Sequence, residues 1–273
     1  MFKTSMAISP TPTKFGPLLF ASEWSRAIQT AEELGYDGIE ISLREPDTEL
    51  LDKLSKAVQR AGLAISAVAT GQSYLHDDLS LTNLDSAAQE KLKDRMCGFI
   101  NFAAPWQALV ILGGVRGTLA TEHSIQLEQF QAATESVRSF AEYAEAFGVR
   151  LAIEPINRYE TNFLNTVEQA LQFIDDVGAD NLVVLPDTFH MNIEEASMSK
   201  PLARAGQKVG YVHFADSNRL APGEGHINFV EIARELEKTN YAGYISAEIL
   251  PIPDSRTAAE LAIEHFRWLQ SQL

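Results

Sequence analysis

Residues 128–154 read EQFQAATESVRSFAEYAEAFGVRLAIE. Apolar side chains recur in the first part at a period of about 3.6 residues, which predicts an amphipathic helix over residues 128–147. Gly148 follows, and glycine most easily takes the left-handed conformation that ends a helix. The run Val149–Ile153 then predicts a short buried strand, and Glu154 closes it. A helix, a glycine and a buried strand with a polar residue at its end make up one unit.

This unit recurs along the chain, and each copy places a glycine between a helix-like stretch and an apolar run. These glycines are Gly35, Gly62, Gly148, Gly178 and Gly243. With the runs that lack such a glycine, the predicted strands are Lys3–Ile8, Gly38–Ser42, Leu63–Ala69, Ala108–Leu112, Val149–Ile153, Leu182–Leu185, Val209–Val212 and Tyr244–Ala247.

Strands that alternate with helices predict a parallel sheet, and eight such units favour a closed (β/α)8 TIM barrel over a doubly wound sheet. No G-x-G-x-x-G follows the first strand, which argues against a dinucleotide-binding doubly wound sheet. The length of 273 residues fits one barrel, and no linker-like stretch interrupts it. We therefore predict an α/β protein of the TIM-barrel type with one domain over residues 1–273.

Composition excludes several classes of function. A net charge of −15 argues against a nucleic-acid partner, because such proteins need clustered Lys and Arg. No apolar run approaches the roughly 20 residues of a membrane span, and the N-terminus lacks the apolar core of a signal peptide. Cys97 is the single cysteine, which favours a reducing compartment. We expect a cytoplasmic protein with no membrane partner.

Four polar residues end the last four predicted strands. They are Glu154, Asp187, His213 and Glu248, at intervals close to the roughly 30 residues of one βα unit. Three carboxylates and an imidazole that converge at the carboxyl ends of parallel strands would repel one another unless a divalent cation lay between them. These hard ligands suit Mn²⁺, Mg²⁺ or Co²⁺, and the lack of a His or Cys cluster argues against structural zinc.

Longer motifs surround these residues. EPINRYE (154–160), DTFHMNIEE (187–195) and HFADSNR (213–219) resemble motifs of the ketose 3-epimerase family, among the xylose-isomerase-like barrels. A closer similarity, to the 5-keto-L-gluconate epimerases of inositol breakdown, is carried by TGQSYL (70–75) and VRG (115–117). The resemblance covers nearly the whole chain.

The resemblance implies an isomerase that epimerises a carbon next to a ketone by proton abstraction through a cis-enediolate, with a divalent ion as Lewis acid, and we expect this ion to be Mn²⁺. It makes Glu154 and Glu248 the proton-transferring pair and also metal ligands, and it makes Asp187 and His213 the remaining ligands. It further implies that Glu160, His190 and Arg219 bind the substrate.

The sequence departs from the free-ketose epimerases after His213, where it reads ADSN (215–218) instead of a Gly-Glu pair. This departure favours a keto sugar acid, such as 5-keto-L-gluconate or D-tagaturonate, over a neutral sugar. Arg44 and Arg116 follow the second and fourth predicted strands, and we hypothesise that one or both bind the acid's carboxylate. Gln72 lies in residues 70–82, which we expect to be a loop that forms a wall or lid, and we expect Gln72 to bind the substrate.

Several alternatives stay open. A ketose 3-epimerase of the D-tagatose or D-psicose type, an inosose dehydratase and a sugar isomerase would each use the same scaffold and metal. A metal-dependent phosphodiesterase acting on DNA would want more His and Asp ligands and a basic groove. A sugar-binding barrel without catalysis is a further possibility. The resembling families also lead us to expect a homodimer or tetramer.

Overall fold

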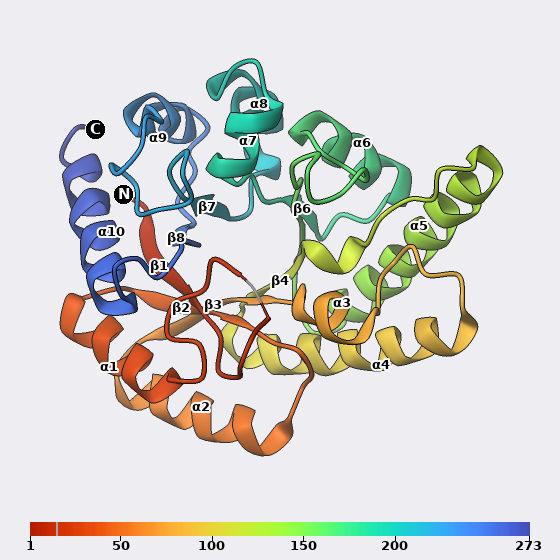
Figure 1. The fold of residues 1–273 in the computed structure, drawn as a ribbon, viewed down its shortest axis with the longest axis horizontal. Coiled ribbons are helices and arrows are strands. Elements are labelled where there is room, and N and C mark those ends of the chain that lie inside the picture. Colours follow the sequence, from red (N-terminus) through yellow and green to blue (C-terminus); the bar gives the residue numbers. More distant parts are fainter. Residues whose placement is uncertain (15) are drawn as a thin grey trace.

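The computed structural model describes residues 1–14 and 16–273. Its eight strands are β1 (Lys3–Ile8), β2 (Gly38–Ser42), β3 (Ala64–Ala69), β4 (Leu109–Leu112), β5 (Leu151–Ile153), β6 (Leu182–Val184), β7 (Val212–Phe214) and β8 (Tyr244–Ala247). They pair in parallel in the order β6-β5-β4-β3-β2-β1-β8-β7. Isolated parallel bridges at Val184–Val209 and Asp187–His213 join the two ends of this order. The strands therefore form a ring with helices outside it (Figure 1).

Helices follow the strands around the ring. They are α1 (Trp24–Leu34), α2 (Thr48–Arg60), α3 (Gln72–Asp77), α4 (Ser86–Ala103), α5 (His123–Glu145), α6 (Val167–Val177), α7 (Thr188–Glu194), α8 (Ser199–Ala205), α9 (Phe229–Lys238) and α10 (Ser255–Gln270). This arrangement confirms the predicted α/β class and the TIM-barrel type.

Two sequence-based predictions about local structure are wrong. Residues 70–82 were expected to form a loop, but they contain the short helix α3. The seventh strand was expected to end at Val212, whereas β7 runs to Phe214, so His213 lies inside the strand. Val209 instead makes an isolated bridge to Val184, because the chain is already extended there before the regular strand begins.

A glycine in the left-handed conformation follows most of the helices for which it was predicted, but not the helix before β8. Gly35 and Gly178 cap α1 and α6 with φ values of 71° and 72°, the left-handed conformation that a Cβ disfavours. Before β8 the left-handed residue is Asn240, with φ 57°, and Gly243 is not among the glycines with positive φ. Asparagine tolerates this conformation better than most residues, which explains how it replaces glycine there.

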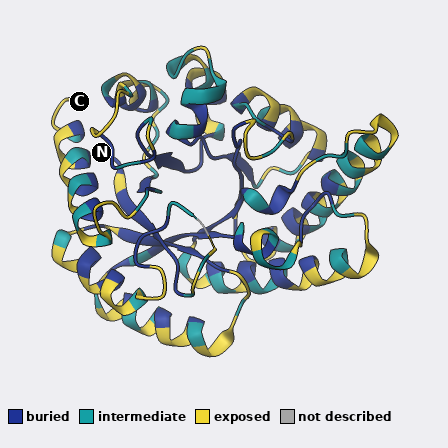
Figure 2. Ribbon diagram, viewed as in Figure 1, coloured by how far each residue is buried: buried dark blue, intermediate teal, exposed yellow. Residues whose placement is uncertain are grey.

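Successive side chains point to opposite faces of each strand, and this alternation separates two apolar cores. The larger core packs the outward faces of the strands against the helices and includes Val110 and Leu112 of β4. The smaller one fills the ring and includes Leu109 and Ile111 of the same strand. Figure 2 shows the strands buried along most of their length, with an exposed residue at the start of β1, and the helices exposed on their outer faces.

The interior of the ring is not uniformly apolar. Glu40 of β2, His213 of β7 and Ser246 of β8 are each fully buried, and hydrogen bonds join their side chains. Alanines at positions 67, 69 and 152 also belong to the inner core. The interior of the barrel thus holds polar side chains beside small apolar ones.

Candidate active site

A cavity of about 430 Å³ opens at the carboxyl ends of the strands. Its walls come from Ser42 at the end of β2, from the segments that follow β1, β3, β4 and β5, and from residues that follow β6, β7 and β8. Active sites of TIM barrels lie at this face because the βα loops converge there. Among the predicted site residues, the ones that line the cavity are Gln72, Arg116, Glu154, Glu160, His190, Arg219 and Glu248.

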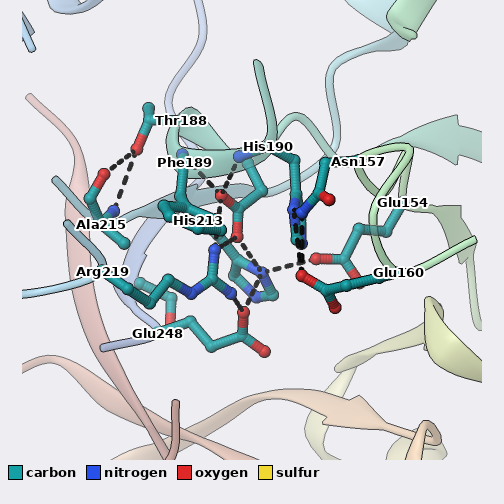
Figure 3. A network of polar contacts seen from close by, with 12 residues as sticks. Glu154, Asn157, Glu160, Thr188, Phe189, His190, His213, Ala215, Arg219 and Glu248 are labelled. Carbon is teal, nitrogen blue, oxygen red and sulfur yellow. Dashed lines mark hydrogen bonds and ion pairs between the residues drawn. The ribbon is translucent and has the colours of Figure 1, made fainter. Parts of the chain in front are cut away.

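The structure brings the four predicted ligand residues together. Glu154, Asp187, His213 and Glu248 each offer one donor atom, and these atoms lie within 4.8 Å of one another. Nδ1 of His213 is 3.0 Å from Glu154, 3.6 Å from Asp187 and 3.5 Å from Glu248. Glu154 and Glu248 reach the imidazole from different sides (Figure 3).

Local structure orients the carboxylates. Glu154 and Glu248 come directly after β5 and β8. Asp187 caps the N-terminus of α7, where its Oδ1 accepts hydrogen bonds from the backbone N–H groups of Phe189 (2.7 Å) and His190 (3.1 Å). The cap sets the direction in which Asp187 faces the cluster.

Arg219 closes one side of the cluster. Its Nη1 donates to both carboxylate oxygens of Asp187, and its Nη2 donates to Glu248. The guanidinium lies over the ring of Phe189, with the carbon atom Cζ 4.7 Å from the ring centroid. A cation stacked on an aromatic face and bonded to two carboxylates is held firmly in place.

Burial and neighbouring charges shift the protonation of these groups in opposite directions. Burial raises the pKa of Glu248 to about 8, although His213 and Arg219 oppose the shift. For Asp187 and Glu154, burial acts in the same direction, but it is outweighed by Arg219 and His190 at Asp187 and by His213 at Glu154, so both pKa values are lowered. The pKa of His213 is raised against burial, because carboxylates surround the ring.

The donor set fits a divalent cation. Three carboxylates and one imidazole nitrogen are hard ligands, and they are buried at the end of a cavity. The fully buried Glu40 adds a fourth carboxyl group beside His213, so four acidic side chains surround one imidazole and one guanidinium. This surplus of acidic groups favours a divalent cation at the cluster.

A second hydrogen-bonded group lies beside the cluster. Asn157 accepts a bond from the backbone N–H of Tyr159, and its Nδ2 lies 2.8 Å from both Glu160 Oε1 and His190 Nδ1. Burial lowers the pKa of His190, which keeps the ring neutral. Because the Nδ2 group of Asn157 donates, Nδ1 of His190 accepts and the ring hydrogen belongs on Nε2. Figure 3 shows Asn157 beside the ring of His190.

Two residues of the cavity wall present buried polar atoms without a partner. Nε2 of Gln72 donates to Ser9 and Ser42, whereas Oε1 has no hydrogen-bond partner among the described residues. Arg116 donates from Nε and Nη1 to backbone carbonyls, and its Nη2 is likewise without a partner in the described part of the chain. Buried polar atoms without a partner are rare in folded proteins, and both of these belong to residues of the cavity wall.

The structure places Arg44 elsewhere. Its guanidinium donates to both oxygens of Asp77, its side chain is 45% exposed, and it is not part of the cavity wall. Asp77 also pairs with the buried Arg95. Arg44 thus belongs to a surface ion-pair network, because α3, which was not predicted, carries Asp77 to it.

The sequence analysis missed Glu40 and Asn157. A signal for Glu40 was present, since a lone carboxylate in the apolar strand GIEIS (38–42) must face either solvent or a buried partner. Asn157 lies inside the quoted motif EPINRYE, but no spacing rule separates it from the other polar residues there. Its role depends on contacts with α7, which only the fold supplies.

Comparison with known proteins agrees with this geometry. The model of the xylose isomerase-like TIM barrel family matches residues 28–272. An L-ribulose 3-epimerase of Mesorhizobium japonicum is 34% identical over 256 residues, which span 90% of this chain and 83% of that enzyme. A D-psicose 3-epimerase of Agrobacterium fabrum is 30% identical over 241 residues, 86% of this chain and 79% of that one.

A solved structure of D-allulose 3-epimerase from Methylomonas sp. superimposes with a TM-score of 0.80 at 26% identity, covering 98% of this chain and 99% of that one. The chain belongs to the ketose 3-epimerase family of the xylose isomerase-like TIM barrels. It is an enzyme of the carbohydrate epimerase type. Within the described residues, no helix is both long and apolar enough to cross a membrane.

Proposed function

We propose that this enzyme epimerises the carbon next to the ketone of a keto sugar acid, interconverting 5-keto-L-gluconate and D-tagaturonate. The main support for this proposal is the buried Arg116, whose Nη2 has no partner among the described residues. Arg116 lies in the wall of the cavity that Glu154 and Glu248 also line. A guanidinium is the group best suited to a carboxylate.

Proton transfer falls to Glu154 and Glu248. Removing a proton beside a ketone leaves a planar cis-enediolate, and inversion requires that a proton return to the opposite face. One glutamate takes the proton and the other returns one, and their approach to His213 from different sides suits this division.

Glu154, Asp187, His213 and Glu248 would hold the divalent ion, for which we propose Mn²⁺. When bound, it would supply a Lewis acid that draws electron density towards the ketone oxygen. His190 contributes a hydrogen-bond donor, because Asn157 occupies its Nδ1 and leaves the hydrogen on Nε2. Glu160, held by Asn157, and Arg219 complete the contacts that orient the sugar.

Arg116 is assigned to the substrate carboxylate in preference to Arg44. Burial lowers the pKa of Arg116 to about 10, so the side chain still carries its charge at neutral pH. Arg44 already pairs with Asp77 outside the cavity wall. Gln72, with an unpaired Oε1, would accept a hydrogen bond from a substrate hydroxyl.

A neutral ketose is the second candidate substrate. The relatives named above are L-ribulose, D-psicose and D-allulose 3-epimerases, and their names support a 3-epimerase of free ketoses at least as well. The proposal of a keto acid as substrate is based on Arg116 and on the ADSN stretch after His213. The cytoplasmic location, the oligomer and the single-domain organisation stay predictions.

A substrate panel tests the proposal. Purified protein with Mn²⁺ in deuterated water is incubated with 5-keto-L-gluconate, D-tagaturonate, D-fructose, D-tagatose and inosose, and products are followed by NMR. We expect a deuterium-labelled epimer and a kcat/KM that is highest for the keto acids. Faster turnover of a neutral ketose would select the second candidate, and loss of water from inosose would indicate a dehydratase.

Arg116→Lys tests the assigned carboxylate contact, with Arg44→Lys as the matched control. Losing a charge-assisted hydrogen bond of about 1.5–3 kcal/mol lowers kcat/KM roughly 10- to 100-fold. We expect this loss for the keto acids only, and no change in the control. An equal loss on keto acids and neutral ketoses would contradict the role of Arg116.

A further inference from the structure

Glu40 is a fully buried carboxylate that the proposed chemistry does not use. It lies in the middle of β2, with 0% of its surface exposed, and it is not part of the cavity wall. An ionised carboxylate in such a place is costly unless other groups pair with it. Inside the ring, Glu40 therefore needs hydrogen-bonding partners from the surrounding strands.

The partners of Glu40 come from two strands that do not pair with β2. Oε1 and Oε2 lie 3.1 and 2.9 Å from Nε2 of His213 on β7, and Oε2 accepts a 2.9 Å hydrogen bond from the hydroxyl of Ser246 on β8. Ser246 lies two residues before Glu248. Glu40 thus contacts both strands that carry the last two predicted metal ligands.

The two nitrogens of His213 face different groups. Nδ1 points at the cluster of Glu154, Asp187 and Glu248, and Nε2 points at Glu40. Because the carboxylate of Glu40 accepts a hydrogen bond, Nε2 carries a hydrogen. Nδ1 is then the nitrogen whose lone pair a cation can use, and the ring cannot rotate without losing the contact.

We propose that Glu40 is a positioning residue for the metal site: it holds the ring orientation and tautomer of His213 and so strengthens the binding of a divalent cation. This inference rests on the metal site of the proposed function. The chemical class of the ligand is a divalent ion that accepts oxygen and imidazole donors, such as Mn²⁺.

Metal affinity tests the inference without any substrate. Chelator-treated wild type, Glu40→Gln and Glu40→Leu are titrated with Mn²⁺ by calorimetry. Loss of an outer hydrogen-bond partner of a ligating histidine weakens metal binding by about 10- to 100-fold. We expect a loss in this range for Glu40→Leu. Glu40→Gln should show a smaller loss, because its amide oxygen still accepts from Nε2 while the charge is gone.

Ser66→Ala is the matched control. Ser66 lies inside the same barrel and bonds to Ser5 and Tyr211, but no hydrogen bond joins it to His213. Its removal should lower the melting temperature without changing the Kd for Mn²⁺. The melting temperature of each metal-free variant shows whether it folds, and Glu40→Gln carries the test if Glu40→Leu does not fold.

An unchanged Kd in a folded Glu40 variant, or a wild type that binds no Mn²⁺, overturns the inference. A lower melting temperature of the metal-free variants with the wild-type Kd would mean that Glu40 is only structural, which also overturns it. A wild type that binds Mn²⁺ in a Glu40-dependent way but epimerises no sugar would leave the inference standing and defeat the proposed function.

Discussion

Nη1 of Arg219 donates to both carboxylate oxygens of Asp187, at 2.9 and 2.8 Å. The same guanidinium reaches Glu248 through Nη2, so one arginine contacts two of the four proposed metal ligands. A positive charge at this position competes with a cation for the same oxygens, while it also lies in the cavity wall where a sugar would bind.

Replacing Arg219 should therefore separate metal binding from turnover. In Arg219→Met we expect an Mn²⁺ affinity equal to or tighter than that of the wild type, because a competing positive charge is gone. We expect kcat/KM to fall roughly 10- to 100-fold, since a charge-assisted contact to the sugar is lost. Calorimetry and steady-state kinetics measure the two effects. Arg256→Gln, at an exposed ion pair with Glu33, is the control. Weaker metal binding in Arg219→Met would contradict this account.

Asn157 should control turnover through the tautomer of His190. In Asn157→Asp, the new carboxylate would accept from Nδ1 and move the ring hydrogen away from Nε2. We expect kcat to fall about 10- to 100-fold, as for other residues that orient a functional histidine. Histidine ¹⁵N chemical shifts report the change of tautomer. An unaltered tautomer together with an unaltered kcat would show that Asn157 only packs.

Removal of either proposed proton-transferring group should stop turnover. A positioned acid or base contributes typically about 10²- to 10⁴-fold, so Glu154→Gln and Glu248→Gln should each lose at least about 100-fold in kcat. Exchange of substrate deuterium into water, followed by NMR, measures proton abstraction directly. EDTA should abolish the activity of the wild type, and added Mn²⁺ should restore it. Activity that survives complete removal of metal would defeat the mechanism.

Asp77 should contribute to stability in a pH-dependent way. Hydrogen bonds from Arg44 and Arg95 lower the pKa of Asp77 below its unfolded value of about 3.9. A lowered pKa stabilises the fold above the unfolded pKa, and this contribution is lost as pH falls. Asp77→Asn should lower the free energy of unfolding at pH 7 by about 2 kcal/mol, because the buried Arg95 loses its charge-assisted hydrogen bond to the carboxylate.

As pH falls below 5, the free energy of unfolding should decrease less in this variant than in wild type. Each pKa unit by which folding lowers the pKa of Asp77 corresponds to about 1.4 kcal/mol of this pH-dependent stability. Urea unfolding at several pH values measures both effects. Asp52→Asn, at an exposed pair with Lys56, should change stability by less than ~0.5 kcal/mol. If the free energy of unfolding fell equally with acidification in wild type and in Asp77→Asn, the assignment to Asp77 would be contradicted.

Local patterns were sufficient to predict the barrel and the four residues that meet above it. Helix periodicity, helix-ending glycines and short apolar runs are properties of neighbouring residues, and eight βα units in succession leave few other folds. Because the carboxyl ends of all eight strands lie at one face, Glu154, Asp187 and Glu248 could be placed together from their order alone. His213 came to the same cluster although it lies inside β7.

The sequence by itself thus determined the fold class, the family motifs and the composition of the candidate metal site. The tertiary structure alone decided that Glu40 meets His213 across 173 positions, and that Arg116 faces the cavity while Arg44 does not. These outcomes depend on side-chain direction and on contacts between distant strands and loops. Spacing along the chain does not predict side-chain direction or these distant contacts, because both are set only when the ring of strands closes.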